Sequence, residues 1–304
     1  MVEKVIVAID GGAASKAALE WALDRVVTLE RMQGTPVQLE LTTVVELGWY
    51  PAEGSDYSSQ PAYERPLAEA LRRVEQVAPS CRKTSYIRHG VPVDELARAS
   101  ATADLLVIGT NKTGVLAGTV FGTLPLRLAA HARCPVVVVP VNWQARGGHI
   151  VVGMENDVTA LVAVDFAARE AERYKLPLDI VHAWTIPATV AVEYGAVLPY
   201  EEIRDAHARI QSGATRRVRD AHPALHIAEV LKQGTAASVL VNASQTASLV
   251  VVGTHGRGAV GSLFLGSVSH DVLMNLPCPV AVVPRPAGEH AESRPDSTEG
   301  VKKR

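Results

Sequence analysis

The chain has 304 residues, a formal net charge of −2, 47% hydrophobic residues and 5% aromatic residues. This length suits one large domain or two of ordinary size, and the near-neutral charge with few aromatics argues against a nucleic-acid partner. Three scattered cysteines exclude a disulfide framework or a CxxC metal site. The apolar runs are too short to cross a membrane and the N-terminus lacks a signal-peptide core, so we expect a cytoplasmic protein with no membrane partner.

The first half of the chain alternates between short β-branched runs and helical patterns. In chain order, we expect strands at residues 5–9, 36–46, 83–90, 104–110 and 134–140, and helices at residues 15–32, 62–78, 92–102 and 123–132. Near-continuous Val and Ile runs predict strands that are buried on both faces. The alternation of strand and helix predicts an α/β fold with a parallel, doubly wound sheet.

The second half repeats the first. Ala101–Thr110 (ATADLLVIGT) recurs as Gln245–Thr254 (QTASLVVVGT), and Cys134–Pro140 (CPVVVVP) recurs as Cys278–Pro284 (CPVAVVP). A repeat of domain size predicts two tandem copies of one domain rather than a solenoid.

The domain boundaries follow from this repeat. We expect the copies over residues 1–145 and 146–286, with a junction near Asn142–Gly148, and a polar, disordered tail over residues 287–304. Each copy is interrupted after its second strand, by Gly48–Pro66 and Thr185–Glu202. Long loops of this kind are often lids or partner surfaces, and tolerated insertion is the alternative.

The segment GTHGRGAVGSLFLGSVS, residues 253–269, contains the spacing G-x-G-x-x-G at Gly256, Gly258 and Gly261. A dinucleotide fingerprint has this spacing but belongs on the first strand–helix turn, with an acid about 20 residues further on. Here the glycines follow the fourth strand of a copy, and the first copy lacks the spacing. We therefore reject the dinucleotide interpretation.

The two copies share a wider frame of glycines. Gly109, Gly114, Gly122 and Thr123 match Gly253, Gly258, Gly266 and Ser267. The shared arrangement is a Gly that ends the fourth strand, then a loop, then Gly-Ser/Thr at the start of a helix. Such a helix N-terminus presents free N–H groups and the positive end of the helix dipole, which suits phosphate. The alternative is structural, with glycines for turns and Ser267 as an ordinary N-cap.

The spacing Gly253-xx-Gly256-x9-Gly266-Ser267, the "CPVAVVP" strand and the "AIDGG" opening resemble the universal stress protein family in its tandem, ATP-binding form. The resemblance implies a Rossmann-like fold of the adenine nucleotide alpha-hydrolase type in each copy, with five strands in the order 3-2-1-4-5. It also implies that the last strands of the two copies pair within one chain. Further dimerisation of the whole chain into a homodimer is expected as well.

In the second copy, the resemblance assigns a phosphate site to six residues: Gly253, Gly256, Gly266, Ser267, Val268 and Ser269. Ala183, after the strand LDIVH, falls at the adenine-facing position. Glu155 stands where an Asp is usual and reaches about one methylene further, and Asn156-Asp157 replace the customary Gly-Ser.

In the first copy, the resemblance assigns the site to Asp10, Val44, Gly109, Gly122 and Thr123. Two residues depart from the pattern. Lys112 replaces the second glycine and could either obstruct the phosphates or neutralise them. Pro125 stands where the second copy has Ser269, and so lacks a hydroxyl. We expect the second copy to be the better site.

Catalytic patterns are weak. His255 lies within the glycine segment and could touch phosphate, but His270-Asp271 are helix neighbours that do not face each other, and no G-x-S-x-G elbow is present. We name no catalytic and no metal-ligating residue. The expected ligand is ATP, or ADP or AMP, with Mg²⁺ as a companion of the nucleotide. The expected role is regulatory; the alternatives are a nucleotide-free interaction scaffold and a slow ATPase.

Overall fold

The computed structural model describes residues 2–46, 60–111, 123–145, 147–186, 199–254, 265–275 and 278–285. Strands and helices alternate along these ranges, as the sequence predicts. Within the described ranges, no helix is long and apolar enough to cross a membrane. The expected tail, residues 287–304, lies outside the described residues.

The first copy contains the strands β1 (Glu3–Ala8), β2 (Val37–Val45), β3 (Arg82–His89), β4 (Leu105–Thr110) and β5 (Val136–Pro140). Its described helices are α1 (Ala13–Gln33), α2 (Gln60–Val77), α3 (Pro92–Ala99) and α4 (Thr123–His131), and a 3₁₀ turn, η1 (Ser100–Thr102), follows α3. Local signals explain two of these boundaries. Gly34 ends α1 in the left-handed region, with φ 60°, and Pro92 opens α3, where its missing N–H is not needed.

The second copy contains the strands β6 (Ile150–Gly153), β7 (Leu178–Trp184), β8 (Ile227–Gln233), β9 (Leu249–Gly253) and β10 (Val280–Val283). Its described helices are α5 (Val158–Tyr174), α7 (Tyr200–Ala221), α8 (Ala236–Ala243) and α9 (Ser267–Met274). Side chains cap two of them: Asp157 accepts from the Ala160 N–H at 2.9 Å at the start of α5, and Thr235 caps α8.

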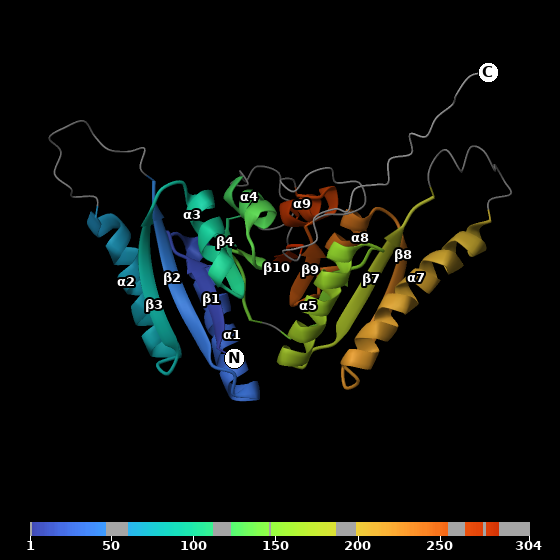
Figure 1. The fold of residues 1–304 in the computed structure, drawn as a ribbon, viewed down its shortest axis with the longest axis horizontal. Helices are drawn as coiled ribbons and strands as arrows, with labels where there is room; N and C mark the ends of the chain where they lie inside the picture. Colours follow the sequence, from blue (N-terminus) through green and yellow to red (C-terminus); the bar gives the residue numbers. More distant parts are fainter. Residues whose placement is uncertain are drawn as a thin grey trace, which may run out of the picture.

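All the strands join one ten-stranded sheet in the order β3-β2-β1-β4-β5-β10-β9-β6-β7-β8. Each copy therefore has the predicted order 3-2-1-4-5, and the neighbouring strands within a copy are parallel. Figure 1 shows the result, with α2 and β3 at one end of the molecule and α7 and β8 at the other.

The two copies meet through their last strands. β5 and β10 pair in antiparallel fashion, with Val137 opposite Ala281 at the centre of the register. The expected pairing within one chain is thus present, and it covers two strand edges that would otherwise be exposed. Both strands are fully buried.

Helices cover both faces of the sheet. One core cluster packs α1, α2, α5 and α7 against one face, and a second packs α3, α4, α8 and α9 against the other. The three cysteines are buried, and burial raises the pKa of the Cys134 thiol to about 12. Buried free cysteines of this kind pack as small hydrophobic side chains.

A buried ionic cluster joins the two copies on the face of the sheet that α1 and α5 cover. Arg25 of α1 contacts Glu3 at 2.8 Å and forms a close pair with Glu170 of α5, while Arg173 contacts Glu3 at 3.0 Å and Glu170 at 2.8 Å. Arg25 and Glu170 are each 1% exposed. Burial alone would raise the pKa of Glu170, but Arg25 and Arg173 outweigh it and hold that pKa below its ordinary value.

Two expected boundaries differ from the structure. The interruption expected over Gly48–Pro66 is shorter, because α2 begins at Gln60 and contains Pro66. Pro66 packs against Gly11, where a Cβ would lie 2.8 Å from the proline ring. The interruption expected through Glu202 likewise ends earlier, since α7 begins at Tyr200.

Candidate functional site

A cavity of about 260 Å³ lies at the carboxyl ends of β6 and β9. These strands are neighbours, and the helices that follow them, α5 and α9, pack on opposite faces of the sheet. This is the topological switch point, where doubly wound sheets bind ligands. The described residues around it are Gly153, Met154, Glu155, Asp157, Ala160, Val181, Ala183, Ala236, Leu240, Val252, Gly253, Gly266, Ser267, Val268 and Ser269.

The cavity brings together the predicted residues of the second copy. Glu155, Ala183, Gly253 and the run Gly266–Ser269 all lie along its walls, although more than 100 residues separate the first from the last in the sequence. Gly256 and His255 lie outside the described residues. All the predicted site residues of the second copy that the structure describes therefore line this one cavity.

The N-terminus of α9 faces this cavity. Gly266 is its N-cap, with φ −63° and ψ 154°, and the Gly266 N–H donates to the Thr254 carbonyl at 2.7 Å. The His270 N–H makes the first intrahelical bond, to the Gly266 carbonyl at 2.9 Å. The preceding N–H groups, those of Ser267, Val268 and Ser269, have no acceptor within the helix. They form the kind of donor set that binds an anion.

The Ser269 side chain has a different role from the expected one. Its hydroxyl donates to the Gly266 carbonyl at 2.9 Å and lies 3.4 Å from the Thr254 carbonyl, and the residue is 2% exposed. The hydroxyl therefore fastens the first turn of α9 to the end of β9. The backbone N–H of Ser269, by contrast, has no acceptor within the helix.

Two carboxylates also line the cavity. Glu155 follows β6, and its Oε1 accepts from the Asn156 N–H at 3.0 Å. Asp157 caps α5 through Oδ1. In the first copy, Asp10 instead accepts from the Gly12 N–H at 2.8 Å, across Gly11, whose φ is 83°. In both copies, the acid after the first strand accepts a hydrogen bond from a nearby backbone N–H. The donor is two residues after the acid in the first copy and one residue after it in the second.

The β7 side of the cavity is apolar. Ala183 lies within β7 rather than after it, because the strand continues to Trp184. Its neighbour His182 is 1% exposed and bonds through Nδ1 to the Met154 carbonyl at 2.9 Å. A carbonyl only accepts, so Nδ1 carries the proton, and this bond fixes β7 against the end of β6 beside Glu155.

Sequence reasoning missed several wall residues: Gly153, Met154, Ala160, Val181, Ala236, Leu240 and Val252. One signal could have found two of them. Ala236 and Leu240 are four residues apart in a short helical pattern after the third strand of the copy, a spacing that places them on one face. The other missed wall residues have the same residue types and spacing as ordinary core residues, so the sequence alone does not distinguish them.

The first copy places its predicted residues at the equivalent edge. Asp10 follows β1, Val44 lies in β2, and Gly109 is the second-last residue of β4. Gly109 has a packing reason to be a glycine, since a Cβ there would lie 2.0 Å from the Ala14 carbonyl oxygen of α1. Thr123 opens α4.

Pro125, in the first turn of α4, is buried. As a proline it has no N–H at the position where the second copy has that of Ser269. Gly122 and Lys112 lie outside the described residues. The difference at Pro125 is therefore the loss of a backbone donor rather than of a facing hydroxyl.

The charge of the described walls of the second-copy cavity is negative. Glu155 and Asp157 are their only titratable residues. In the described part of the chain, no three His, Cys, Asp or Glu side chains are grouped so as to hold a metal ion. The arrangement can bind a ligand that is anionic at one end, near α9, and that offers hydroxyls or other donors to carboxylates at the other.

Comparison with known proteins agrees with this geometry. The model of the universal stress protein family matches residues 1–140 and 148–284. A universal stress protein of Mycobacterium bovis is 30% identical over 305 residues, which cover 91% of this chain and 94% of the relative. Another from the same organism is 27% identical over 292 residues, 91% of this chain and 96% of the relative.

A solved structure has the same fold. The crystal structure of a universal stress protein from Archaeoglobus fulgidus superposes with a TM-score of 0.62 at 16% identity, over 93% of this chain and 98% of that one. That likeness concerns the fold, whereas the two family-model matches cover most of the sequence. The chain belongs to the universal stress protein family, in its tandem, two-domain form.

Proposed function

We propose that the second copy binds an adenine nucleotide, ATP or its products ADP and AMP, as a regulatory ligand. The observation that carries the proposal is the convergence of Glu155, Ala183, Gly253 and Gly266–Ser269 on one cavity at the switch point. In this proposal, the phosphates lie at the N-terminus of α9, and the nucleoside lies between the ends of β6 and β7.

The chemistry of each wall supports this orientation. Free N–H groups and the positive helix end favour the phosphates near Ser267. Carboxylates accept hydrogen bonds from ribose hydroxyls, as in other doubly wound folds, which suits Glu155. The small side chain of Ala183 leaves room for a flat base. A cavity of about 260 Å³ suits part of a nucleotide, given that small-molecule sites span roughly 300–1,000 Å³.

A regulatory role fits better than a catalytic one. The described walls provide no metal-binding cluster and no Lys or Arg, which are the groups that phosphoryl-transfer enzymes direct at the transferred phosphate. Mg²⁺ would arrive with the nucleotide. We also propose a cytoplasmic stress-response protein whose whole chain forms a homodimer.

The test is an isothermal titration with ATP on the purified full chain, together with analysis of nucleotide released on denaturation. Ala183→Phe fills the adenine end and should abolish the tight site. Its matched control is Val44→Phe in the first copy, at the same register position: β2 and β7 pair with β1 and β6 through Leu39 opposite Val5 and Leu178 opposite Ile150.

We expect one tight site per chain, lost in Ala183→Phe and kept in Val44→Phe. Two equal sites would contradict the difference between the copies. No released nucleotide, and no shift in melting temperature with ATP, would favour the scaffold. Phosphate release that disappears on substitution of Gly266 or Ser267 would favour a slow ATPase.

A further inference from the structure

A second cavity, of about 330 Å³, lies between the two copies at the opposite edge of the sheet from the nucleotide site. Ile150 and Leu249, the first residues of β6 and β9, contribute to it, whereas the nucleotide site lies at the other ends of the same strands. The first copy contributes Trp21 and Asp24 from α1. This junction cavity is therefore separate from the proposed nucleotide site and exists only because the copies are paired.

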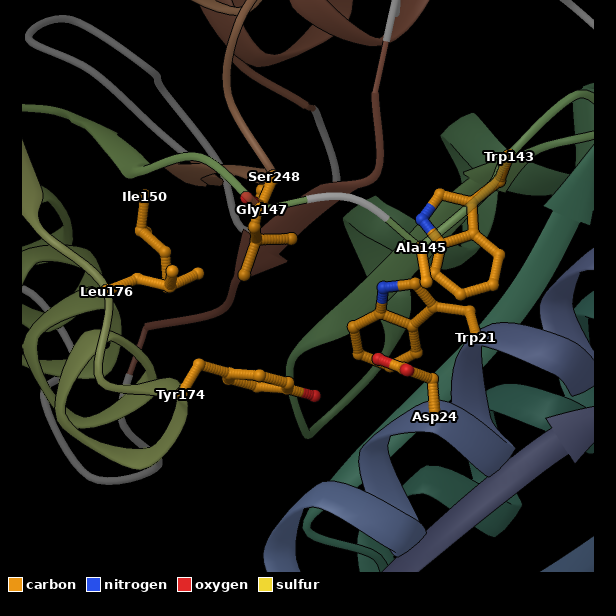
Figure 2. A pocket seen from close by; sticks show the side chains of 10 residues that line it. Trp21, Asp24, Trp143, Ala145, Gly147, Ile150, Tyr174, Leu176 and Ser248 are labelled. Atoms are coloured by element: carbon orange, nitrogen blue, oxygen red, sulfur yellow. The ribbon is translucent and has the colours of Figure 1, made fainter. Parts of the chain in front are cut away.

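Three aromatic rings surround the junction cavity. Figure 2 shows Tyr174 across the cavity from Trp21 and Trp143, with the Asp24 carboxylate on the side of Trp21 and the Tyr174 hydroxyl directed toward that side. Ile150, Leu176 and Leu249 add an aliphatic wall. Aromatic rings attract a cation that lies over one of their faces, and the aliphatic wall favours a cation that carries hydrocarbon.

Two of the three rings, those of Trp21 and Tyr174, contact Arg25 of the buried ionic cluster. The Arg25 guanidinium lies 5.9 Å from the centroid of the Trp21 ring and 6.0 Å from that of the Tyr174 ring. Arg25 is itself fixed by Glu3 and Glu170. A cavity whose walls are fixed in advance loses little conformational freedom on binding.

Asp24 gives the junction cavity its charge. In the nearby cluster, two arginines balance two glutamates, and Asp24 is the single charged residue among the described walls. Among the described residues it has no hydrogen bond or ion pair, and burial raises the pKa of its carboxyl. A half-buried carboxylate without a counter-charge is stabilised when a cation binds beside it.

From these observations we propose that the junction cavity binds a small organic ammonium ion, with the charged head between the rings and Asp24 and its hydrocarbon part against Leu176. A metal ion is disfavoured, because Asp24 is the single carboxylate among the described walls and hard cations need several oxygen ligands. The site is independent of nucleotide binding, so each proposal can fail without the other.

The probe is choline, compared with 3,3-dimethylbutan-1-ol, a neutral molecule of the same shape. Trp21 and Trp143, two of the four tryptophans in the chain, report binding by fluorescence, and saturation-transfer NMR on the ligand methyl groups reports contact. We expect choline to bind at least about tenfold more tightly than the neutral isostere, which is the scale of a desolvated cation–π interaction.

Four variants, one of them a matched control, test this proposal. Asp24→Asn should remove most of the preference for choline, whereas Asp165→Asn, which removes a half-exposed carboxylate from α5, should leave it unchanged. Trp143→Leu should weaken choline binding, and circular dichroism checks its fold. Arg146 lies between Ala145 and Gly147 in the sequence, which both line the cavity, and is itself outside the described residues. Arg146→Gln tests whether this arginine competes with choline, and we expect it to change choline binding by less than about threefold.

The proposal is overturned if choline does not bind at millimolar concentration, if the isostere binds equally well, or if Asp24→Asn leaves the preference for choline intact. A large gain in choline affinity in Arg146→Gln would also overturn it, because the chain's own arginine would then be the cation at this site.

Discussion

The two copies have the same strand order and the same placement of an acid and a glycine at the carboxyl edge, yet they differ at the helix that would receive a phosphate. α9 begins with Ser267-Val268-Ser269, and α4 begins with Thr123-Leu124-Pro125. Since a proline has no N–H, the first copy has fewer donors at that helix end. Copies with the same fold can therefore offer different donors to a ligand, and in the proposed function this missing N–H is one of the differences between the two sites.

The copies also differ where they touch. Arg25 and Glu170 occupy equivalent positions on α1 and α5, and they contact each other across the pseudo-twofold axis. A symmetric pair of first copies would place arginine against arginine, and a pair of second copies glutamate against glutamate. An interface between identical domains must be self-complementary, whereas the tandem chain can use opposite charges. The junction thus favours pairing of a first copy with a second.

The largest expected effect concerns this junction. Arg25→Met leaves Glu3 and Glu170 buried with Arg173 as their remaining partner, and breaking a buried ion pair costs about 3–5 kcal/mol. We expect a loss of that size in the free energy of unfolding, measured by urea denaturation. The matched control is Arg73→Met, which breaks the exposed pair with Glu20 and should cost at most about 1 kcal/mol. Equal losses of unfolding free energy in the two variants would show that the buried cluster stabilises the fold no more than an exposed ion pair does.

The next effect concerns the difference between the helix starts. Ser269→Pro gives α9 the first turn of α4 and removes one N–H from the proposed phosphate site. A hydrogen bond to a charged group contributes about 1.5–3 kcal/mol, so ATP affinity should fall at least about tenfold. Ser269→Ala removes only the hydroxyl, which is already bonded to the Gly266 carbonyl, and should change affinity little.

The converse change is Pro125→Ser in the first copy. If titration calorimetry finds an additional ATP site in this variant, that result supports the proposed difference between the copies. If Ser269→Ala weakened ATP binding as much as Ser269→Pro, the hydroxyl rather than the N–H would be the ligand, and the proposed difference between the copies would be wrong.

The smallest effect is a dependence on pH. Because the pKa of Glu170 is lowered in the folded state, ionised Glu170 stabilises the fold above its unfolded pKa, and this contribution is lost as pH falls through the folded pKa. The stability difference between the wild type and Glu170→Gln should be largest at neutral pH and shrink below about pH 4.3. Urea midpoints at a series of pH values measure it, with Glu20→Gln as the exposed control. A difference that stays constant down to pH 3 would refute this account.

Much of the fold was predictable because its signals are local or repeated. Buried Val and Ile runs predicted the strands, and the recurrence of "CPVVVVP" as "CPVAVVP" predicted two copies. The resemblance to the family implied that the last strands of the copies pair, as β5 and β10 do. Boundaries were less predictable. Pro66 indicated a loop, but it packs on Gly11 inside α2, a contact that no local pattern reveals.

The candidate site was predictable in outline. The glycine frame and the resemblance named Glu155, Ala183 and Gly266–Ser269, and the structure brings them to one cavity. The direction of the Ser269 side chain was not predictable. Its hydroxyl turns toward carbonyls of its own backbone, and sequence spacing says nothing about which way a short side chain in a first helical turn will point.

Local patterns in the sequence predicted two α/β copies with parallel strands, because hydrophobic periodicity and the repeat are visible without a structure. The order of the strands was predicted by the resemblance to the family, and the edge expected to bind a ligand follows from the rule that parallel strands present their carboxyl ends together. Only the tertiary structure decided the meeting of Arg25 with Glu170, 145 residues apart, and the junction cavity with Asp24 beside it. Such contacts depend on how two folded domains face each other, and no pattern within either copy specifies that.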